Sequence, residues 1–394
     1  MKLAGIRISS VANDLGGRVW NPRIRWSVKH AVFVELLCED GRVGLGECWC
    51  FDAAPDALIA FLRTEVVPKL LEAELSEAGA VMAELTRRAT LTARHGMLAS
   101  ALSGVDLALW DLVAQHKGLP LWRALGPEGA GEVLLYASGG LYAPDKDAAA
   151  LAEELAGYAA RGFSTVKMKI GGLPIEEDVA RVAAARSRLG PHVGLIVDGV
   201  YSYDADQALA LFDRIRDLDI QAFQSPLPPD DLAGMRSLCH EGVPVMGIEA
   251  EYREEVFAEL IEGGAVAILQ VAPVACGGPS RVLSLAARAR AAGIGLSLET
   301  SSTAVATLAA AQLGAAKAAI DHVELHQIHR VFFDQLGLDA GRFEASRWRL
   351  PERSGLGIAL DPARVQVAFE AKAGSDRRKA AKASEVRLAS PVGP

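Results

Sequence analysis

The sequence predicts an α/β protein in which an eight-stranded parallel barrel follows a separate α+β unit. From Gly131 onward, short apolar runs alternate with helical segments. Eight such runs separated by seven helices indicate a closed TIM-type barrel, because a doubly wound open sheet of eight uninterrupted βα units is unusually long. The predicted strands are 133–137, 165–170, 194–198, 221–224, 244–249, 266–271, 293–299 and 322–326.

Residues 1–130 follow a different pattern, which predicts an α+β unit. Strand-like alternation covers 1–10, 31–37 and 43–47, with Glu39-Asp40-Gly41 as a hairpin turn between the last two. Helical periodicity follows over 56–71 and 79–88 and in a strongly apolar segment from Ala99 to Leu112, which ends at Gly118-Leu119-Pro120.

The remaining chain divides into the barrel over 131–347, one more strand near 365–369 and a terminal tail. The tail, 371–394, is rich in Ala, Lys, Arg and Ser, a composition that predicts a flexible segment.

Composition narrows the class of protein. Of 394 residues, 51% are hydrophobic and 23% charged, as in soluble globular proteins, and the net charge of -8 argues against nucleic acid or anionic membrane as a partner. The five cysteines are scattered and form no CxxC pair, and the N-terminus has no apolar signal region. We therefore expect a cytoplasmic protein without a membrane span.

Two lysines mark the second predicted strand of the barrel. Lys167 and Lys169 are two residues apart in Thr165–Lys169, so their side chains point to the same side. If that side is the barrel interior, the two ammonium groups lower each other's pKa and burial lowers it further, as a base near neutral pH requires. On an exposed strand the same pair would only be solvated.

Polar residues near the ends of successive strands favour the interior position. In a barrel the carboxyl ends of the strands form one mouth, where active sites are built. One or two of the carboxylates could instead be helix N-caps. The residues in question are Lys169, Asp198, Gln224, Glu249, Gln270, Glu299 and Glu324.

Three stretches give the chain a family resemblance. They are Ala101–Leu112, Thr165–Lys169 and Pro226-Leu227-Pro228-Pro229-Asp230-Asp231. With these motifs the chain resembles the enolase superfamily, of the mandelate racemase and muconate lactonizing enzyme type. The resemblance implies a modified (β/α)7β barrel and a capping domain built from both chain ends, so that 348–370 would complete the cap. It also implies one Mg²⁺ and removal of the proton α to a carboxylate.

Position by position, the resemblance assigns roles to the strand-end residues. Asp198 and Glu249 correspond to metal ligands, and Gln224 stands where the family has a ligating glutamate. An amide carbonyl can bind Mg²⁺ but lacks the negative charge, so we expect weak or absent metal binding. Lys169 corresponds to the catalytic base, with Lys167 tuning it.

Other positions depart from the family pattern. Val200 replaces an asparagine, Ala272 an aspartate and Glu299 a histidine, so the familiar second base is missing. Glu299 could act as an acid if burial raised its pKa, and Glu324 falls where the family hydrogen-bonds the substrate.

The cap and the eighth strand supply candidates for substrate binding. Lys29, His30, Trp26 and His326 are predicted to contact the substrate, and each could instead be a structural residue. Trp20, Arg25, Trp49 and Phe51 are further candidates for closing the mouth.

These features favour a lyase or isomerase acting on a small, hydroxylated carboxylate, by dehydration or cycloisomerisation. The alternatives are a racemase or epimerase of a carboxylate or amino acid, a ligand-binding relative without activity, and an enzyme that no longer uses metal. The resemblance and the apolar composition also predict a homo-oligomer, most simply one with two-fold symmetry.

Overall fold

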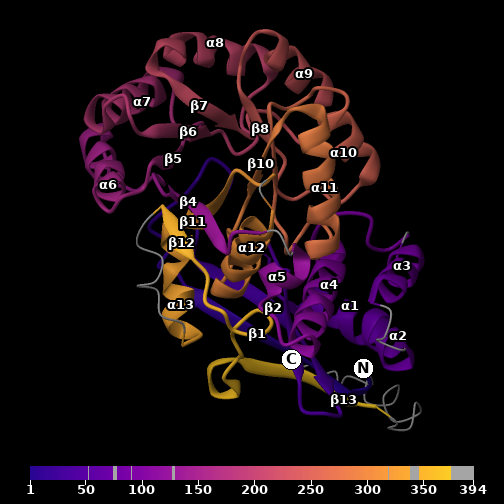
Figure 1. Ribbon diagram of the computed structural model, residues 1–394. Coiled ribbons are helices and arrows are strands. Elements are labelled where there is room, and N and C mark those ends of the chain that lie inside the picture. Colours follow the sequence, from indigo (N-terminus) through magenta and orange to yellow (C-terminus); the bar gives the residue numbers. More distant parts are fainter. Residues whose placement is uncertain are drawn as a thin grey trace, which may run out of the picture.

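A computed structural model describes residues 1–51, 53–73, 78–89, 91–126, 129–317, 319–337 and 346–373. The predicted tail, 371–394, lies outside the described residues from position 374 onward. Two sheets organise the molecule: a four-stranded antiparallel sheet and a closed parallel barrel. The barrel fills the upper part of Figure 1, and the antiparallel sheet lies below it.

The antiparallel sheet has the strand order β13-β1-β2-β3 and joins both ends of the chain. Its N-terminal strands are β1 (Leu3–Asp14), β2 (Val28–Cys38) and β3 (Val43–Trp49), and β13 (Gln366–Lys372) pairs with β1. The strand predicted near 365–369 is therefore confirmed, at the sheet edge (Figure 1).

Helices pack on one side of this sheet. The run predicted over 56–71 forms α1 (Asp56–Phe61), a π turn (Leu62–Val66) and α2 (Val67–Glu72), and it is followed by α3 (Ala78–Arg88). The apolar segment forms α4 (Met97–His116), whose buried residues face nearly all directions. Within the described ranges α4 alone is long and apolar enough to cross a membrane, but most of it is buried against β3 and its neighbours. Its apolar composition is therefore that of a core helix.

The barrel consists of eight parallel strands, as predicted. Each predicted apolar run forms one of them, and β11 pairs with β4 to close the ring. The strands are β4 (Glu132–Ser138), β5 (Thr165–Lys169), β6 (Gly194–Asp198), β7 (Ile220–Gln224), β8 (Val245–Gly247), β9 (Ile268–Val271), β10 (Gly295–Leu298) and β11 (His322–His326).

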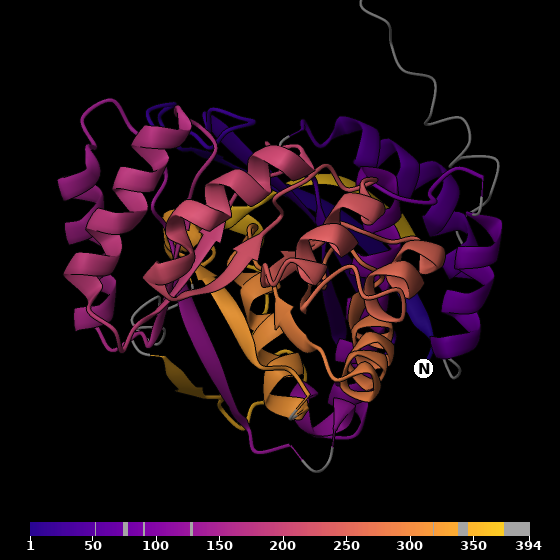
Figure 2. The same ribbon diagram turned by 90° about the horizontal axis from the view of Figure 1, so that it is seen from above.

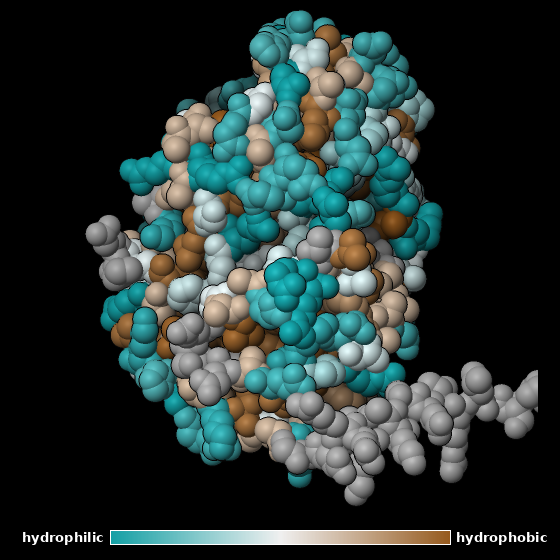
Figure 3. Space-filling model, turned by 90° about the vertical axis from the view of Figure 1, so that its right-hand side faces the viewer, coloured by the Kyte–Doolittle hydropathy of each residue, from teal (hydrophilic) through white to brown (hydrophobic). Residues whose placement is uncertain are grey.

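Seven helices connect these strands and surround the barrel, as Figures 1 and 2 show. Several begin at a side chain that caps the first turn, such as Asp204 before α8 and Thr303 before α12. The face seen in Figure 3 is largely hydrophilic, with hydrophobic residues in scattered groups. The connecting helices are α6 (Ala148–Ala160), α7 (Ile175–Leu189), α8 (Ala205–Ile215), α9 (Leu232–His240), α10 (Glu254–Ile261), α11 (Gly278–Ala292) and α12 (Ala304–Ala316).

Short elements complete the fold. Helix α5 (Leu121–Leu125) links the two sheets, and α13 (Val331–Gln335) follows the last barrel strand. Strand β12 (Arg347–Arg349) pairs antiparallel with β4 on the outside of the ring. Short 3-10 turns within the described residues lie at 216–218, 327–330 and 362–364. The predicted fold class, a TIM-type barrel with an α+β cap from both chain ends, is confirmed.

Candidate active site

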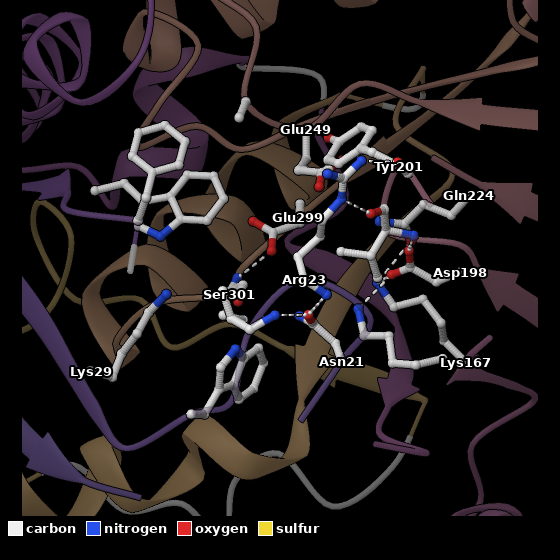
Figure 4. A pocket seen from close by; sticks show the side chains of 17 residues that line it. Asn21, Arg23, Lys29, Lys167, Asp198, Tyr201, Gln224, Glu249, Glu299 and Ser301 are labelled. Atoms are coloured by element: carbon white, nitrogen blue, oxygen red, sulfur yellow. Dashed lines mark hydrogen bonds and ion pairs between the residues drawn. The ribbon is translucent and has the colours of Figure 1, made fainter. Parts of the chain in front are cut away.

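A pocket lies where the capping sheet meets the carboxyl ends of the barrel strands. The barrel contributes residues from β5, β6 and β7 and from the segments after β6, β8 and β10, and the cap contributes the loop before β2, the start of β2 and the end of β3. Its lining residues are Asn21, Arg23, Ile24, Trp26, Lys29, Trp49, Phe51, Lys167, Lys169, Asp198, Val200, Tyr201, Gln224, Glu249, Ala250, Glu299 and Ser301 (Figure 4).

Lys167 and Lys169 both point into the barrel, as the strand alternation predicts. Lys169 Nζ lies 2.5 Å from Asp198 Oδ2, on the neighbouring strand. Lys167 is deeper: its Nζ is 2.6 Å from Glu324 Oε1 and donates to Gln224 Oε1 at 2.8 Å. The side chain of Lys167 is only 1% exposed, whereas Lys169 reaches further toward the pocket.

The predicted lowering of the Lys167 pKa is wrong. Burial by itself lowers the pKa of Lys167, but the carboxylates of Glu324 and Asp198 outweigh burial, and its pKa is well above the ordinary value. In return the two lysines lower the pKa of Glu324 to about 2 against the effect of its burial. Lys167 is therefore a fixed positive charge. The spacing of the two lysines in the sequence gives no information about Glu324, the acidic partner of Lys167 on β11.

Three side chains whose oxygen atoms could bind a metal ion lie at the ends of successive strands of the barrel. Asp198 and Gln224 end β6 and β7, and Glu249 lies just beyond β8. Asp198 Oδ1 accepts the Val200 amide at 3.0 Å, and the Ser225 hydroxyl donates to Glu249 Oε2 at 2.9 Å. Burial and the nearby Asp198 raise the pKa of Glu249.

This donor set fits a hard cation such as Mg²⁺. Carboxylate and amide oxygens are the ligands that Mg²⁺ takes, and the repulsion between Asp198 and Glu249 would be relieved by positive charge beside them. The set carries two carboxylates, and in the part of the chain that the structure describes no cluster of three His, Cys, Asp or Glu could hold a metal ion. The third candidate ligand, Gln224, offers a neutral amide oxygen, so this site has one negative charge fewer than a site built from three carboxylates.

Glu299 follows β10 and lies between the two halves of the pocket (Figure 4). Its Oε1 accepts the Ser301 amide at 2.8 Å. Burial first, and then the carboxylates of Glu324 and Glu249, raise the pKa of Glu299 well above its ordinary value. A carboxyl group whose pKa is raised in this way keeps its proton to higher pH, as a general acid requires.

Glu324 does not line the pocket itself but contacts Lys167, which does. It is fully buried, and besides Lys167 its Oε2 accepts the Thr300 amide at 3.2 Å. The structure therefore places it where it holds Lys167 and the segment after β10. Its predicted contact with the substrate would need a rearrangement of this pair.

The cap supplies four of the predicted mouth residues, namely Trp26, Lys29, Trp49 and Phe51. Lys29 Nζ lies over the Trp49 ring, 5.5 Å from its centroid. His30 is not brought to this pocket, because neighbouring residues on a strand point to opposite sides, and it lines a separate hollow near Gln335. Nor do Trp20 and Arg25 line the pocket; they stack on each other.

His326 and His329 form a stack with Trp26 beneath the pocket wall. The two imidazole centroids are 4.4 Å apart, and each lies about 5 Å from the Trp26 ring, at 5.2 Å and 5.1 Å. Burial and neighbouring positive charges lower the pKa of both histidines well below the ordinary value, so both are neutral.

Several lining residues were not predicted from the sequence. Arg23 crosses from the cap loop to the barrel, where its Nε donates to the Val200 carbonyl at 3.2 Å and its Nη2 donates to the Tyr201 carbonyl. Val200 and Tyr201 both have a positive φ, 47° and 60°, which turns these carbonyls toward the cap. Such contacts depend on loop conformation, and the sequence carries no periodic signal for them.

Comparisons with known proteins agree with this geometry. Residues 25–126 match the mandelate racemase / muconate lactonizing enzyme N-terminal domain, and residues 148–364 match the enolase C-terminal domain-like family. The second match covers more than half of the chain. The chain belongs to the mandelate racemase and muconate lactonizing enzyme family of the enolase superfamily.

Related proteins of this family are enzymes. The chain is 30% identical to a D-galactarolactone cycloisomerase of Agrobacterium fabrum, over 80% of this chain and 83% of the relative. It is also 30% identical to an arabinonate dehydratase of Saccharolobus solfataricus, over 84% of this chain and 88% of the relative. More distant relatives include an L-Ala-D/L-Glu epimerase of Bacillus subtilis.

A solved structure shows the same fold over nearly the whole chain. It is a mandelate racemase/muconate lactonizing enzyme-like protein from Rubrobacter xylanophilus, 28% identical, with a TM-score of 0.82 and coverage of 92% of this chain and 98% of that chain. Members of the superfamily use Mg²⁺, and one structural neighbour was solved with bound magnesium. This member of the family is accordingly an enzyme, a lyase or isomerase.

Proposed function

We propose that this enzyme removes the α-proton of a hydroxylated carboxylate and expels a β-oxygen, as an acid-sugar dehydratase does. The observation that carries this proposal is that Lys169 and the buried Glu299, whose pKa is raised well above its ordinary value, line the same pocket. Elimination needs one base and one acid, and the pocket offers one of each. The relatives that act on acid sugars support the same class of reaction.

The residues divide the work as follows. Lys169 takes the proton from the carbon next to the substrate carboxylate. Asp198, Gln224 and Glu249 would hold Mg²⁺, which supplies a Lewis acid for that carboxylate. Lys167, fixed by Glu324 and Gln224, adds positive charge where negative charge develops.

Glu299 then gives its proton to the leaving oxygen. The α-C–H and β-C–O bonds break, a carbon–carbon double bond forms, and the oxygen leaves as water. The enol that results becomes a 2-keto acid. In a lactone the same two groups would expel the ring ester oxygen, which is the first half of a cycloisomerisation.

Two variants test this division of roles in D₂O with a panel of acid sugars. Lys169→Ala should abolish both solvent exchange at the α-carbon, followed by NMR, and product formation. Glu299→Gln cannot donate a proton, so it should keep α-proton exchange while losing at least about 100-fold in product formation.

The control is Lys2→Ala, which alters an exposed lysine of the cap. It should behave as the parent enzyme does. If Lys169→Ala still exchanges the α-proton at the parent rate, or Glu299→Gln still eliminates, these roles are wrong. Products lighter by one water identify dehydration, and a lactone converted to an open-chain 2-keto acid of the same composition identifies cycloisomerisation.

A further inference from the structure

The end of the pocket formed by the cap is built largely from hydrogen-bond donors. Figure 4 shows Lys29 on one side of the pocket and Lys167 and Asp198 on the other, with Glu299 and Ser301 between them. Lys29, Trp26 and Trp49 line this end, and His326 and His329 lie directly behind Trp26.

We propose that this end of the pocket binds a second carboxylate, so that the substrate is a sugar diacid with Lys29 as the principal contact of its distal carboxylate. The inference rests on the proposed function for the carboxylate at the other end. It specifies which of the acid sugars the pocket selects.

The position of Lys29 is the first support. Lys29 is 2% exposed although it lines the pocket, and its ammonium group faces the ring of Trp49. Its charge lowers the pKa of His326 and His329 and acts on Glu299 as well. An ammonium group held in so sheltered a place interacts strongly with an anion that enters beside it.

Unpartnered polar groups near Lys29 are the second support. In the described structure the indole Nε1 groups of Trp26 and Trp49, which both line the pocket, are buried without a hydrogen-bond partner. The ring nitrogens of His326 and His329 behind Trp26 are also unpartnered, and each neutral imidazole offers one N–H donor. Buried polar groups in proteins nearly always have a partner, and an orphaned group indicates a ligand or an ordered water. A carboxylate accepts several such hydrogen bonds at once.

The charges of the lining residues are the third support. Arg23, Lys29, Lys167 and Lys169 face Asp198, Glu249 and Glu299, and Glu324 balances Lys167 from behind. The acidic members of this set all come from the barrel, whereas the charged residues that the cap contributes to the lining, Arg23 and Lys29, are both positive. An anionic group of the substrate is therefore favoured at the cap end of the pocket.

The test compares diacids with monoacids of matched configuration, such as galactarate with galactonate, across a panel of hexoses and pentoses. We expect the parent enzyme to favour its best diacid over the matching monoacid by at least about 100-fold in kcat/KM. Lys29→Met, which keeps the apolar stem, should reduce that ratio by at least about 30-fold, as expected for the loss of a sheltered charge pair.

Two further variants control for folding and for charge. Lys29→Arg keeps the positive charge and should retain most of the preference for diacids, and Lys2→Met removes an exposed cap lysine and should not change it. A parent enzyme that uses monoacids equally well, or a ratio that Lys29→Met leaves intact, overturns the inference. Should Lys29→Met fail to fold, the ratio of the parent enzyme decides.

Calorimetry separates this inference from the proposed function. If no acid is turned over, the proposed function fails, and binding of galactarate and galactonate to the parent enzyme is compared directly. Diacid binding at least about tenfold tighter, and lost in Lys29→Met, supports the distal carboxylate site. Equal binding, or no binding of either acid, overturns it. Turnover of monoacids alone leaves the proposed function standing and ends the inference.

Discussion

Lys167 illustrates how a partner outweighs burial. A lysine that is 1% exposed would lose its proton in an apolar interior, yet here Glu324 lies 2.6 Å away and Asp198 3.5 Å away. The two carboxylates keep it charged. Such a residue cannot serve as a base, which is why the proposed function gives proton removal to Lys169, which lies nearer the pocket.

The ion pair between Lys167 and Glu324 should contribute to the stability of the folded protein. Glu324→Gln removes the charge that compensates Lys167, and we expect it to lower the free energy of unfolding by about 3 kcal/mol at pH 7, since breaking a buried pair leaves an unpaired charge. Urea unfolding measures the change. The matched control is Glu370→Gln, which breaks the exposed pair with Arg7 and should cost less than about 1 kcal/mol.

The same pair predicts a pH dependence. Because the pKa of Glu324 falls to about 2 in the folded protein, its contribution is complete above the unfolded pKa of about 4.3 and is lost as pH falls toward 2. The difference between parent and Glu324→Gln should therefore shrink below about pH 4. A difference that stays constant from pH 7 to pH 3 would contradict this account.

Gln224 provides a prediction about the metal. Gln224→Glu restores a negative charge beside Asp198 and Glu249, and we expect Mg²⁺ to bind about tenfold tighter by calorimetry. Gln221→Glu, on the same strand but exposed, is the matched control and should leave affinity unchanged. If Gln224→Glu binds Mg²⁺ no better, Gln224 is not a ligand.

At the scale of elements, periodicity predicted the strands well. The apolar run 165–170 forms β5 at 165–169, and 194–198 forms β6 at the same residues, because buried barrel strands are short and bounded by turns. Even the position of the polar strand ends was predictable. The partner of each side chain was not: Lys167 and Glu324 lie on strands far apart in sequence, and ring closure brings them together.

Loops limited the prediction of the site. Arg23 and Tyr201 line the pocket through backbone turns that leave no pattern in the sequence. Because successive side chains of β2 point to opposite faces of the sheet, Lys29 faces the pocket and His30 does not. From sequence alone the two were equivalent candidates, because the side of β2 that faces the barrel was not known.

Glycines let β3 and α4 approach closely, which gives a prediction for the cap. A Cβ at Gly46 would lie 1.8 Å from the Gly104 carbonyl oxygen, so Gly46→Ala must push the helix away. We expect it to lower the free energy of unfolding by about 3 kcal/mol or more, as overpacking does. Gly79→Ala, in α3 with open space around it, should instead be neutral or stabilise by up to about 1 kcal/mol. Equal effects of the two substitutions in urea unfolding would refute this explanation.

At the scale of the whole molecule, cap and barrel meet around one buried carboxylate. Glu47 of β3 accepts hydrogen bonds from the Ser302 and Thr303 hydroxyls, and from the Ala306 amide at 2.8 Å. These residues follow Glu299 directly and begin α12. The cap therefore helps to position the segment that carries the proposed acid, as well as supplying Lys29.

The assembly of whole molecules stays a prediction. The apolar composition and the family both favour a homo-oligomer, and closed two-fold symmetry is the commonest arrangement. Light scattering at micromolar concentration should therefore give the mass of an even number of chains. A monomer mass that does not change on dilution would exclude it.

The arrangement of the mouth as a whole predicts the stereochemistry of proton transfer. Lys169, the proposed base, lies at the end of β5. The position where the family pattern expects a sixth-strand aspartate holds Ala272, which is buried and apolar. The other candidate on that side, Glu299, is the proposed acid, and its raised pKa favours the protonated form, which does not remove a proton. Proton exchange should therefore take place from one face only. In D₂O, NMR of recovered substrate should show deuterium at the α-carbon with a single configuration and no accumulation of the epimer. Deuterium appearing equally in both configurations would reveal a second base and make this enzyme an epimerase.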